Sequence, residues 1–149
     1  KREYFKLVPQ TTLRSSWRGP IKVRRYKRVP LREGASLDPG DLVEVRLTVD
    51  AKNDYSYLVF EDYKPAGLEA VELKSGYRLQ HGLWYQLELR DRKAAIFVRR
   101  LAQGRQVLSY RLRASNPGHF NAMPHQAHAM YAPRVRANST NLRLSVTTR

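Results

Sequence analysis

Apolar and polar residues alternate with a period of two along several stretches of the chain. Residues 41–51 (DLVEVRLTVDA) place their valines and Leu47 on one face and mainly charged residues on the other. Successive side chains of a β-strand point to opposite faces, so this pattern predicts a strand with one buried face. Residues 83–91 and 142–148 repeat the alternation and predict two more such strands.

Three further runs, 55–62, 93–101 and 105–114, are rich in the β-branched and aromatic residues that strands favour. Short connections containing Gly, Pro, Asn or Asp separate the runs, and no helical apolar stripe exceeds two turns. We therefore predict an all-β fold, an antiparallel β-sandwich that leaves room for one short helix at 68–76 or 123–131. Its predicted core contains Val43, Val45, Leu47, Leu87, Phe97, Tyr110 and Leu144.

The composition fits one folded domain of a longer protein. The chain has 149 residues, of which 42% are hydrophobic, and this is enough to bury a single core. It starts at Lys1 instead of methionine, so we interpret residues 1–149 as a single domain and a fragment of a larger parent chain. Cysteine is absent, which excludes disulfides, thiolate metal ligands and thiol nucleophiles from these residues.

The charge of the chain is strongly positive, with 28 Lys and Arg against 13 Asp and Glu, or +15 at pH 7. Such a balance attracts polyanions. Lys22, Arg24 and Arg28 share a predicted strand face with Tyr26, a mixture found on nucleic-acid-binding sheets. The other basic residues are scattered, and no nucleic-acid-binding motif accompanies them, which disfavours direct binding of nucleic acid. No apolar run is long enough to span a bilayer, so we expect no membrane contact.

Catalytic and metal-binding patterns are missing from the sequence. Glu61 and Asp62 are neighbours in a predicted strand, so they point to opposite faces and cannot act together as an acid and a base. His125 and His128 form the one close histidine pair, yet residues 115–137 contain no Asp, Glu or Cys to complete a metal site. We predict no enzyme activity, no metal and no cofactor, and interpret both histidines as surface or loop residues.

Residues 115–134 are rich in Pro, His and Met and are long for an ordinary connection. We expect this segment to lie across the sandwich as a connection, held there by Phe120 and Tyr131. Leaving either ring exposed would forfeit about 1.5 to 3 kcal/mol, so both rings are predicted to be mostly buried.

The order of unusual segments from Gly40 to Ser139 closely resembles the C-terminal macroglobulin-type domain of bacterial alpha-2-macroglobulins. The stretch EDYKPAGLEAVELKSGY (61–77) and the later stretches SNPGHFNAMP and HAMYAP carry most of the resemblance. Arg90-Asp91 and Gly104, which bound two hairpins, add to it. The family motif residues in this sequence are Asp62, Pro65, Gly67, Glu69, Pro117, Gly118, Phe120, Met130 and Tyr131.

The resemblance implies a non-enzymatic domain of a secreted or periplasmic protease trap. In that family a target protease cuts a bait region, and a thioester in another domain captures the attacker. The thioester needs a cysteine, so it cannot lie in these residues. The implied partners are the other domains of the parent chain, the thioester domain above all, which this domain would pack against or shield. The alternative is a free-standing basic β-domain that binds nucleic acid or another polyanion.

Within this resemblance we assign the motif residues structural roles. Pro65 lacks a backbone donor and Gly67 tolerates positive φ, so the KPAG sequence can turn the chain sharply. We interpret Asp62 as an acceptor that stabilises this turn, and Glu69 as structural too.

Overall fold

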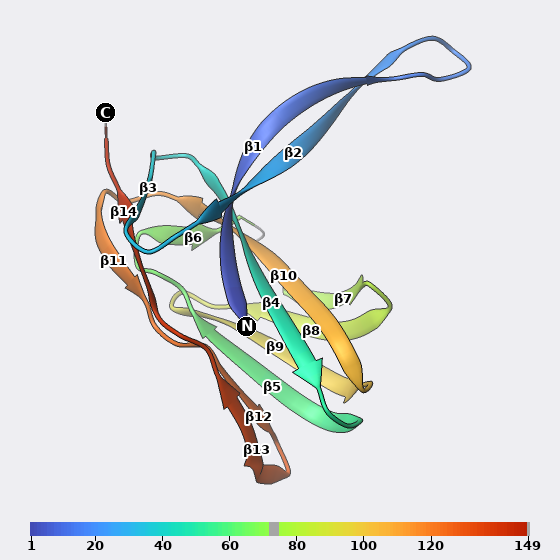
Figure 1. Ribbon diagram of the computed structural model, residues 1–149, viewed down its shortest axis with the longest axis vertical. Coiled ribbons are helices and arrows are strands. Elements are labelled where there is room, and N and C mark those ends of the chain that lie inside the picture. Colours follow the sequence, from blue (N-terminus) through green and yellow to red (C-terminus); the bar gives the residue numbers. More distant parts are fainter. Residues whose placement is uncertain (72–74, 149) are drawn as a thin grey trace.

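The computed structural model describes residues 1–71 and 75–148, and within them the chain forms fourteen strands and no helix. Two sheets face each other (Figure 1). One has the order β2 (Ile21–Leu31), β1 (Arg2–Arg14), β4 (Leu42–Ala51), β10 (Gly104–Ala114) and β6 (Leu68–Ala70). The other has the order β13 (Ala132–Asn138), β12 (Gln126–Ala129), β5 (Tyr55–Tyr63), β9 (Lys93–Leu101), β8 (Leu83–Leu89) and β7 (Gly76–Gln80).

A small third sheet closes one end of the sandwich. It consists of β11 (Gly118–Ala122), β14 (Leu142–Val146) and β3 (Ala35–Leu37), in that order. The pairing of β14 with β3 is parallel, whereas the neighbouring strands of the two large sheets are antiparallel. Leu37, Leu144 and Val146 of this sheet are buried and join the main core, so the three sheets enclose one hydrophobic interior.

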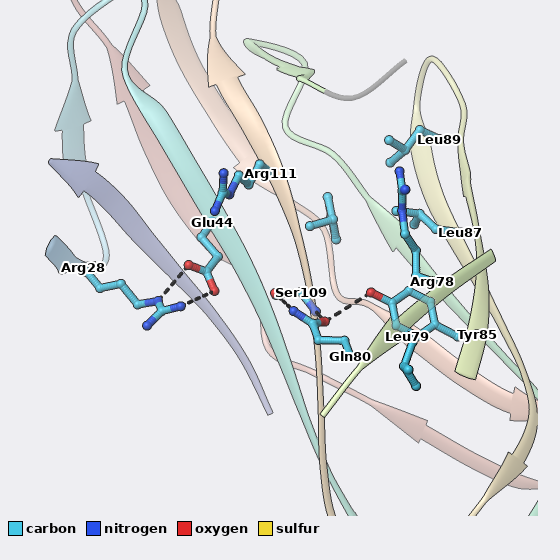
Figure 2. Close-up of a pocket in the computed structure, with 11 residues that line it drawn as sticks. Arg28, Glu44, Arg78, Leu79, Gln80, Tyr85, Leu87, Leu89, Ser109 and Arg111 are labelled. Carbon is cyan, nitrogen blue, oxygen red and sulfur yellow. Dashed lines mark hydrogen bonds and ion pairs between the residues drawn. The ribbon is translucent and has the colours of Figure 1, made fainter. Parts of the chain in front are cut away.

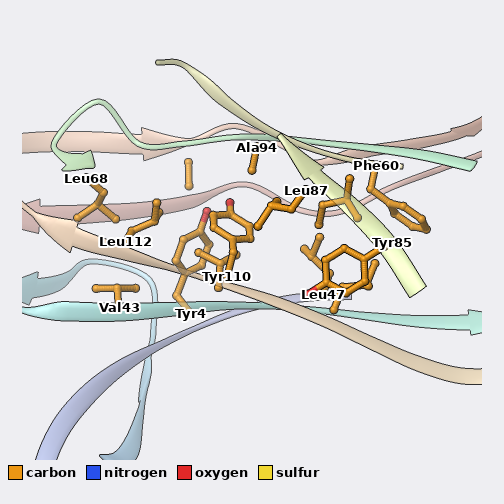
Figure 3. Close-up of a cluster of buried hydrophobic side chains, with 14 of the residues drawn as sticks. Tyr4, Val43, Leu47, Phe60, Leu68, Tyr85, Leu87, Ala94, Tyr110 and Leu112 are labelled. Carbon is orange, nitrogen blue, oxygen red and sulfur yellow. The ribbon is translucent and has the colours of Figure 1, made fainter. Parts of the chain in front are cut away.

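The core lies between the inner faces of the two large sheets (Figure 3). Val43, Val45 and Leu47 alternate along β4 and are fully buried, as the period-two pattern predicts. Opposite them, β5 and β8 contribute Phe60 and Leu87. The predicted all-β sandwich is therefore confirmed, and the predicted strands at 41–51, 55–62, 83–91, 93–101, 105–114 and 142–148 correspond to β4, β5, β8, β9, β10 and β14.

The prediction for Phe97 was wrong. Six of the seven predicted core residues are buried, but Phe97 is half-buried on the outer face of β9. Ala94, Ile96 and Val98 are the residues of β9 that point inward. Two adjacent alanines, at 94 and 95, do not show which alternate positions of β9 point inward. The large apolar ring of Phe97 was therefore assigned to the inner face, and that face was the wrong one.

Neither of the proposed helix sites is helical where the structure describes it. The first contains β6 and the first residue of β7, and its residues 72–74 lie outside the described part; the second contains β12. Residues 115–134 are also not a long connection, because they form β11, β12 and the start of β13. In the described residues there is no helix of the length and apolarity needed to cross a membrane.

Candidate functional site

The two glycine-containing motifs, at 65–69 and 117–120, meet in the structure. The ring of Phe120 lies against the backbone of Gly67, where a Cβ atom would come within 2.1 Å of the ring. The Gly67 carbonyl also accepts a hydrogen bond from the backbone N–H of Ser115, at 2.9 Å. Gly67 does not adopt positive φ, so our explanation for this glycine was wrong. Close approach of an aromatic ring, not backbone conformation, requires glycine here.

Phe120 also lies close to a glycine of its own motif. Gly118 has φ of 148°, and a Cβ atom there would lie 2.9 Å from the same ring. Phe120 is half-buried, pairs with Leu144 across β11 and β14, and packs against the main core. The prediction that this ring is mostly buried is confirmed, whereas Pro117 is exposed.

The turn after β5 forms as predicted. Pro65 is buried, and its carbonyl accepts a hydrogen bond from the backbone N–H of Leu68 at 2.9 Å. Glu69 is exposed on β6, opposite Arg113 of β10. Its structural role therefore stays a prediction.

Asp62 does not stabilise this turn, and that prediction was wrong. Its side chain is fully buried and points into the core, where it forms an ion pair with Arg2. The hydroxyl of Tyr110 donates to the other carboxylate oxygen at 2.7 Å. Arg2 also donates to the backbone carbonyls of Ala122 at 2.9 Å and Thr140 at 3.0 Å. The buried pair thus ties the first strand to the C-terminal part of the domain.

The electrostatics around Asp62 follow from burial. Burial, followed by the negative charge of Asp62, holds the pKa of Tyr110 well above its usual value, so this hydroxyl stays a donor. Tyr4, which is also buried nearby, has its pKa raised for the same two reasons. A paired buried carboxylate surrounded by protonated phenols has no free acid or base function, so this network is structural.

His125 and His128 differ sharply in environment. His125 is a loop residue between β11 and β12, as predicted, but it is only 5% exposed and stacks on Phe60 with ring centroids 6.0 Å apart, so it does not lie at the surface. Burial lowers its pKa, against the opposing effect of the Asp62 charge. His128 is half-buried on β12. In the described part of the chain, no three His, Cys, Asp or Glu side chains lie together as metal ligands would.

Tyr131 is 79% exposed, and the prediction that it is buried was wrong. It lies with the exposed Met130 in the turn between β12 and β13. The backbone N–H of Met130 donates to the carbonyl of Tyr57 at 2.8 Å, and the Tyr57 and Tyr131 rings meet edge to face with centroids 5.3 Å apart. The turn is therefore fixed to β5 while it presents an aromatic ring to solvent.

The exposed rings continue from this turn to β8. Tyr57 and Trp84 line one hollow of about 570 Å³, together with Arg99 and Arg100. Trp84 is 62% exposed and pairs across the strands with the exposed Leu79. We refer to Tyr57, Trp84 and Tyr131 as the aromatic patch. Tyr and Trp are enriched at protein interfaces, because they combine large apolar area with a polar group.

A family model described as the bacterial alpha-2-macroglobulin MG10 domain matches residues 2–134. The chain belongs to this family. Its strands also superpose on solved relatives: a point mutant of Salmonella alpha-2-macroglobulin, with TM-score 0.65, is 22% identical over 97% of this chain and 9% of that one. Native Escherichia coli alpha-2-macroglobulin from domain MG7 to its C-terminus, with TM-score 0.57, is 23% identical over 73% of this chain and 20% of that one.

A curated protein, circularly permutated Ras protein 2 of Dictyostelium discoideum, is 28% identical over 107 residues. That alignment covers 72% of this chain and 3% of the relative. The chain thus spans only a small part of each protein that it resembles. The family model assigns the chain to the bacterial alpha-2-macroglobulins, and the chain corresponds to one domain of these much longer proteins.

Sequence reasoning missed how this MG10 domain uses Asp62, although the sequence contained a signal. Asp62 lies in phase with Leu58 and Phe60 of β5, so the alternation itself directs its carboxylate inward. A buried carboxylate needs a cationic or hydrogen-bonding partner. No local pattern identified Arg2, which lies 60 positions away in sequence.

A second acidic residue missed from sequence is Glu44 of β4. It is 5% exposed on the outer face of its sheet, where Arg28 donates to both carboxylate oxygens at 2.7 and 3.2 Å. Figure 2 shows Glu44 between Arg28 and Arg111, at a cavity of about 310 Å³. On the far side of the cavity Gln80 bonds both the backbone and the hydroxyl of Ser109. Glu44 and Ser109 are thus both engaged by side chains of the domain itself.

Proposed function

We propose that this chain is a non-enzymatic MG10 domain of an alpha-2-macroglobulin protease trap, and that it packs against and shields the thioester-carrying domain of its parent. Family membership supports the trap as the parent. Target proteases would then meet the parent and not this domain, and the parent would be periplasmic or secreted.

The observation that carries the proposed contact is the exposure of the aromatic patch. The Tyr131 ring is held in place by Tyr57 yet remains 79% exposed. A rigid, exposed aromatic group costs little conformational entropy when a partner covers it. The rings stand on the six-stranded sheet, whose inner face is already filled by the core. The patch is therefore suited to bind a neighbouring domain.

A polyanion-binding function has less support. The register places Lys22, Arg24, Tyr26 and Arg28 on one face of β2, as predicted. However, Arg28 is neutralised by Glu44, and Arg111 lies over the Tyr26 ring at 5.5 Å from its centroid. A base could not stack on this ring without displacing the guanidinium.

A binding experiment tests the proposal. Residues 1–149 would be titrated calorimetrically into the remainder of the parent chain that lacks them. Tyr131→Ala and Trp84→Ala are each expected to weaken binding roughly 30-fold, as expected for a central aromatic anchor. Trp17→Ala removes an even more exposed aromatic elsewhere and serves as the matched control, with unchanged affinity expected.

Shielding requires a second measurement in the full-length parent. If the patch covers the thioester domain, Tyr131→Ala should increase the rate at which the intact parent reacts with a small amine. Equal affinity of the Tyr131→Ala and wild-type domains for the remainder of the parent would contradict the proposed contact. Weaker binding with an unchanged amine reaction would support packing without shielding.

A further inference from the structure

The hairpin of β1 and β2 extends well beyond the sandwich (Figure 1). β1 pairs with β4 only from Arg2 to Leu7, whereas it pairs with β2 as far as Arg14. Residues 8–27, which we call the arm, therefore consist of two strand segments paired only with each other and the turn between them. The backbone N–H of Gly19 donates to the carbonyl of Ser16 at 2.9 Å and closes this turn.

The tip of the arm carries three exposed apolar side chains. Trp17 occupies a central position of the turn and is 86% exposed, while Leu13 and Ile21 on either side are 70% and 48% exposed. Leu13 pairs with Lys22 and Ile21 with Arg14, so the two aliphatic residues lie on opposite faces of the hairpin. The apolar groups thus surround the tip, and end-on contact would bury all three.

The arm is also uniformly basic. It contains no Asp or Glu, and its Lys and Arg residues are Arg14, Arg18, Lys22, Arg24, Arg25 and Lys27. The Arg18 guanidinium lies over the Trp17 ring, 4.4 Å from its centroid, so cation and indole share the tip. An anionic surface would meet positive charge and apolar side chains at the same place.

We propose that the arm inserts its tip into the headgroup region of an anionic phospholipid surface. Tryptophan favours the boundary between headgroups and acyl chains, and basic residues beside it are attracted to anionic lipid. The aliphatic pair favours lipid over nucleic acid, because Leu13 and Ile21 gain apolar burial at the acyl-chain boundary and carry no group that hydrogen-bonds a base edge. A second copy of this chain is a less suitable partner, because two arms of like charge would repel each other.

This differs from the expectation of no membrane contact, which rested on the absence of a long apolar run. Interfacial insertion needs only a small apolar surface supported by cations. The inference is independent of the aromatic patch, which lies on the other sheet of the sandwich.

Vesicle binding tests the inference. The chain would be mixed with vesicles of phosphatidylcholine alone or of equal parts phosphatidylcholine and phosphatidylglycerol, and bound protein measured by sedimentation. We expect binding only to the anionic vesicles, weakening as salt is added. Trp17→Ala should lower the partition coefficient roughly tenfold or more, from lost apolar burial. Tyr77→Ala removes another exposed aromatic ring, outside both the arm and the aromatic patch, so it is the matched control and should bind like the wild type.

Charge and depth give two further readouts. Replacing Arg14 and Lys22 together by glutamine should weaken binding about 25-fold, at about fivefold per cation near the surface. In a Trp84→Phe background, Trp17 emission should shift to the blue on binding and be quenched by brominated lipid.

Three results would overturn the inference. One is equal binding of wild type and Trp17→Ala to anionic vesicles. Another is that a single-stranded oligonucleotide quenches the Trp17 emission whereas anionic vesicles do not change it. The third is a blue shift that appears without vesicles and grows with protein concentration, which would assign the tip to self-association. Trp17 is exposed in the turn, so its variants should melt like the wild type and failure to fold cannot explain any of these results.

Discussion

Replacing Gly67 with alanine tests the contact on which the two family motifs converge. The new methyl carbon would lie 2.1, 2.5 and 2.6 Å from three carbons of the Phe120 ring, where ordinary contact begins at 3.4 Å. The ring would have to move about 1.3 Å to restore that separation. Gly118 also approaches this ring and Leu144 pairs with Phe120 on β14, so both limit its movement, whereas elsewhere the ring borders a hollow of about 560 Å³.

Overpacking of this kind costs about 1 to 3 kcal/mol, which for a domain of this size lowers Tm by roughly 2 to 12 °C. Thermal melts followed by circular dichroism, with urea titrations, would measure the loss. Gly76→Ala is the matched control, because a Cβ there meets no atom within 4 Å and Gly76 does not have positive φ. Its Tm should stay close to that of the wild type.

A double variant shows whether the ring is the cause. Phe120→Leu removes most of the clashing atoms, so Gly67→Ala combined with Phe120→Leu should lose less stability than the two single losses added. If Gly67→Ala melts with the wild type, or if the losses add, the close packing of the two motifs is not what requires glycine at this position.

Other changes give separate expectations. Asp62→Asn leaves the Arg2 guanidinium buried without a counter-charge, so urea titration should show that the free energy of unfolding falls by about 3 to 5 kcal/mol. Asp50→Asn removes one partner of an exposed ion pair, and it should change the free energy of unfolding little. Burial lowers the pKa of His125 below 6.5, so the unfolded chain takes up the proton first. Stability should then fall as pH drops below 6.5 towards the lowered pKa, and His125→Leu should flatten this dependence; an unchanged profile would contradict the assignment. Tyr131→Ala should leave Tm of the isolated domain within about 1 °C, whereas Phe120→Ala should lower it by several degrees, and similar melts for the two would refute the assigned environments.

The local pattern determined the class of fold. Strict alternation in residues 41–51 fixed the inward face of β4, because side chains on a strand repeat every two residues whatever the strand packs against. The turn at Pro65 was also predictable from local backbone restrictions. The order of the family motifs identified the domain, since their spacing is a property of the sequence alone.

Tertiary structure decided which surfaces are covered. Alternation assigns a residue to a face but does not say what lies against that face. Phe97 and Tyr131 were therefore predicted to be buried, although Phe97 is half-buried and Tyr131 is exposed. Pairings between distant positions also carry no local signal. Arg2 reaches Asp62 and Phe120 reaches Gly67 only because β1 and β11 are brought beside the end of β5, and that arrangement depends on the packing of the whole core.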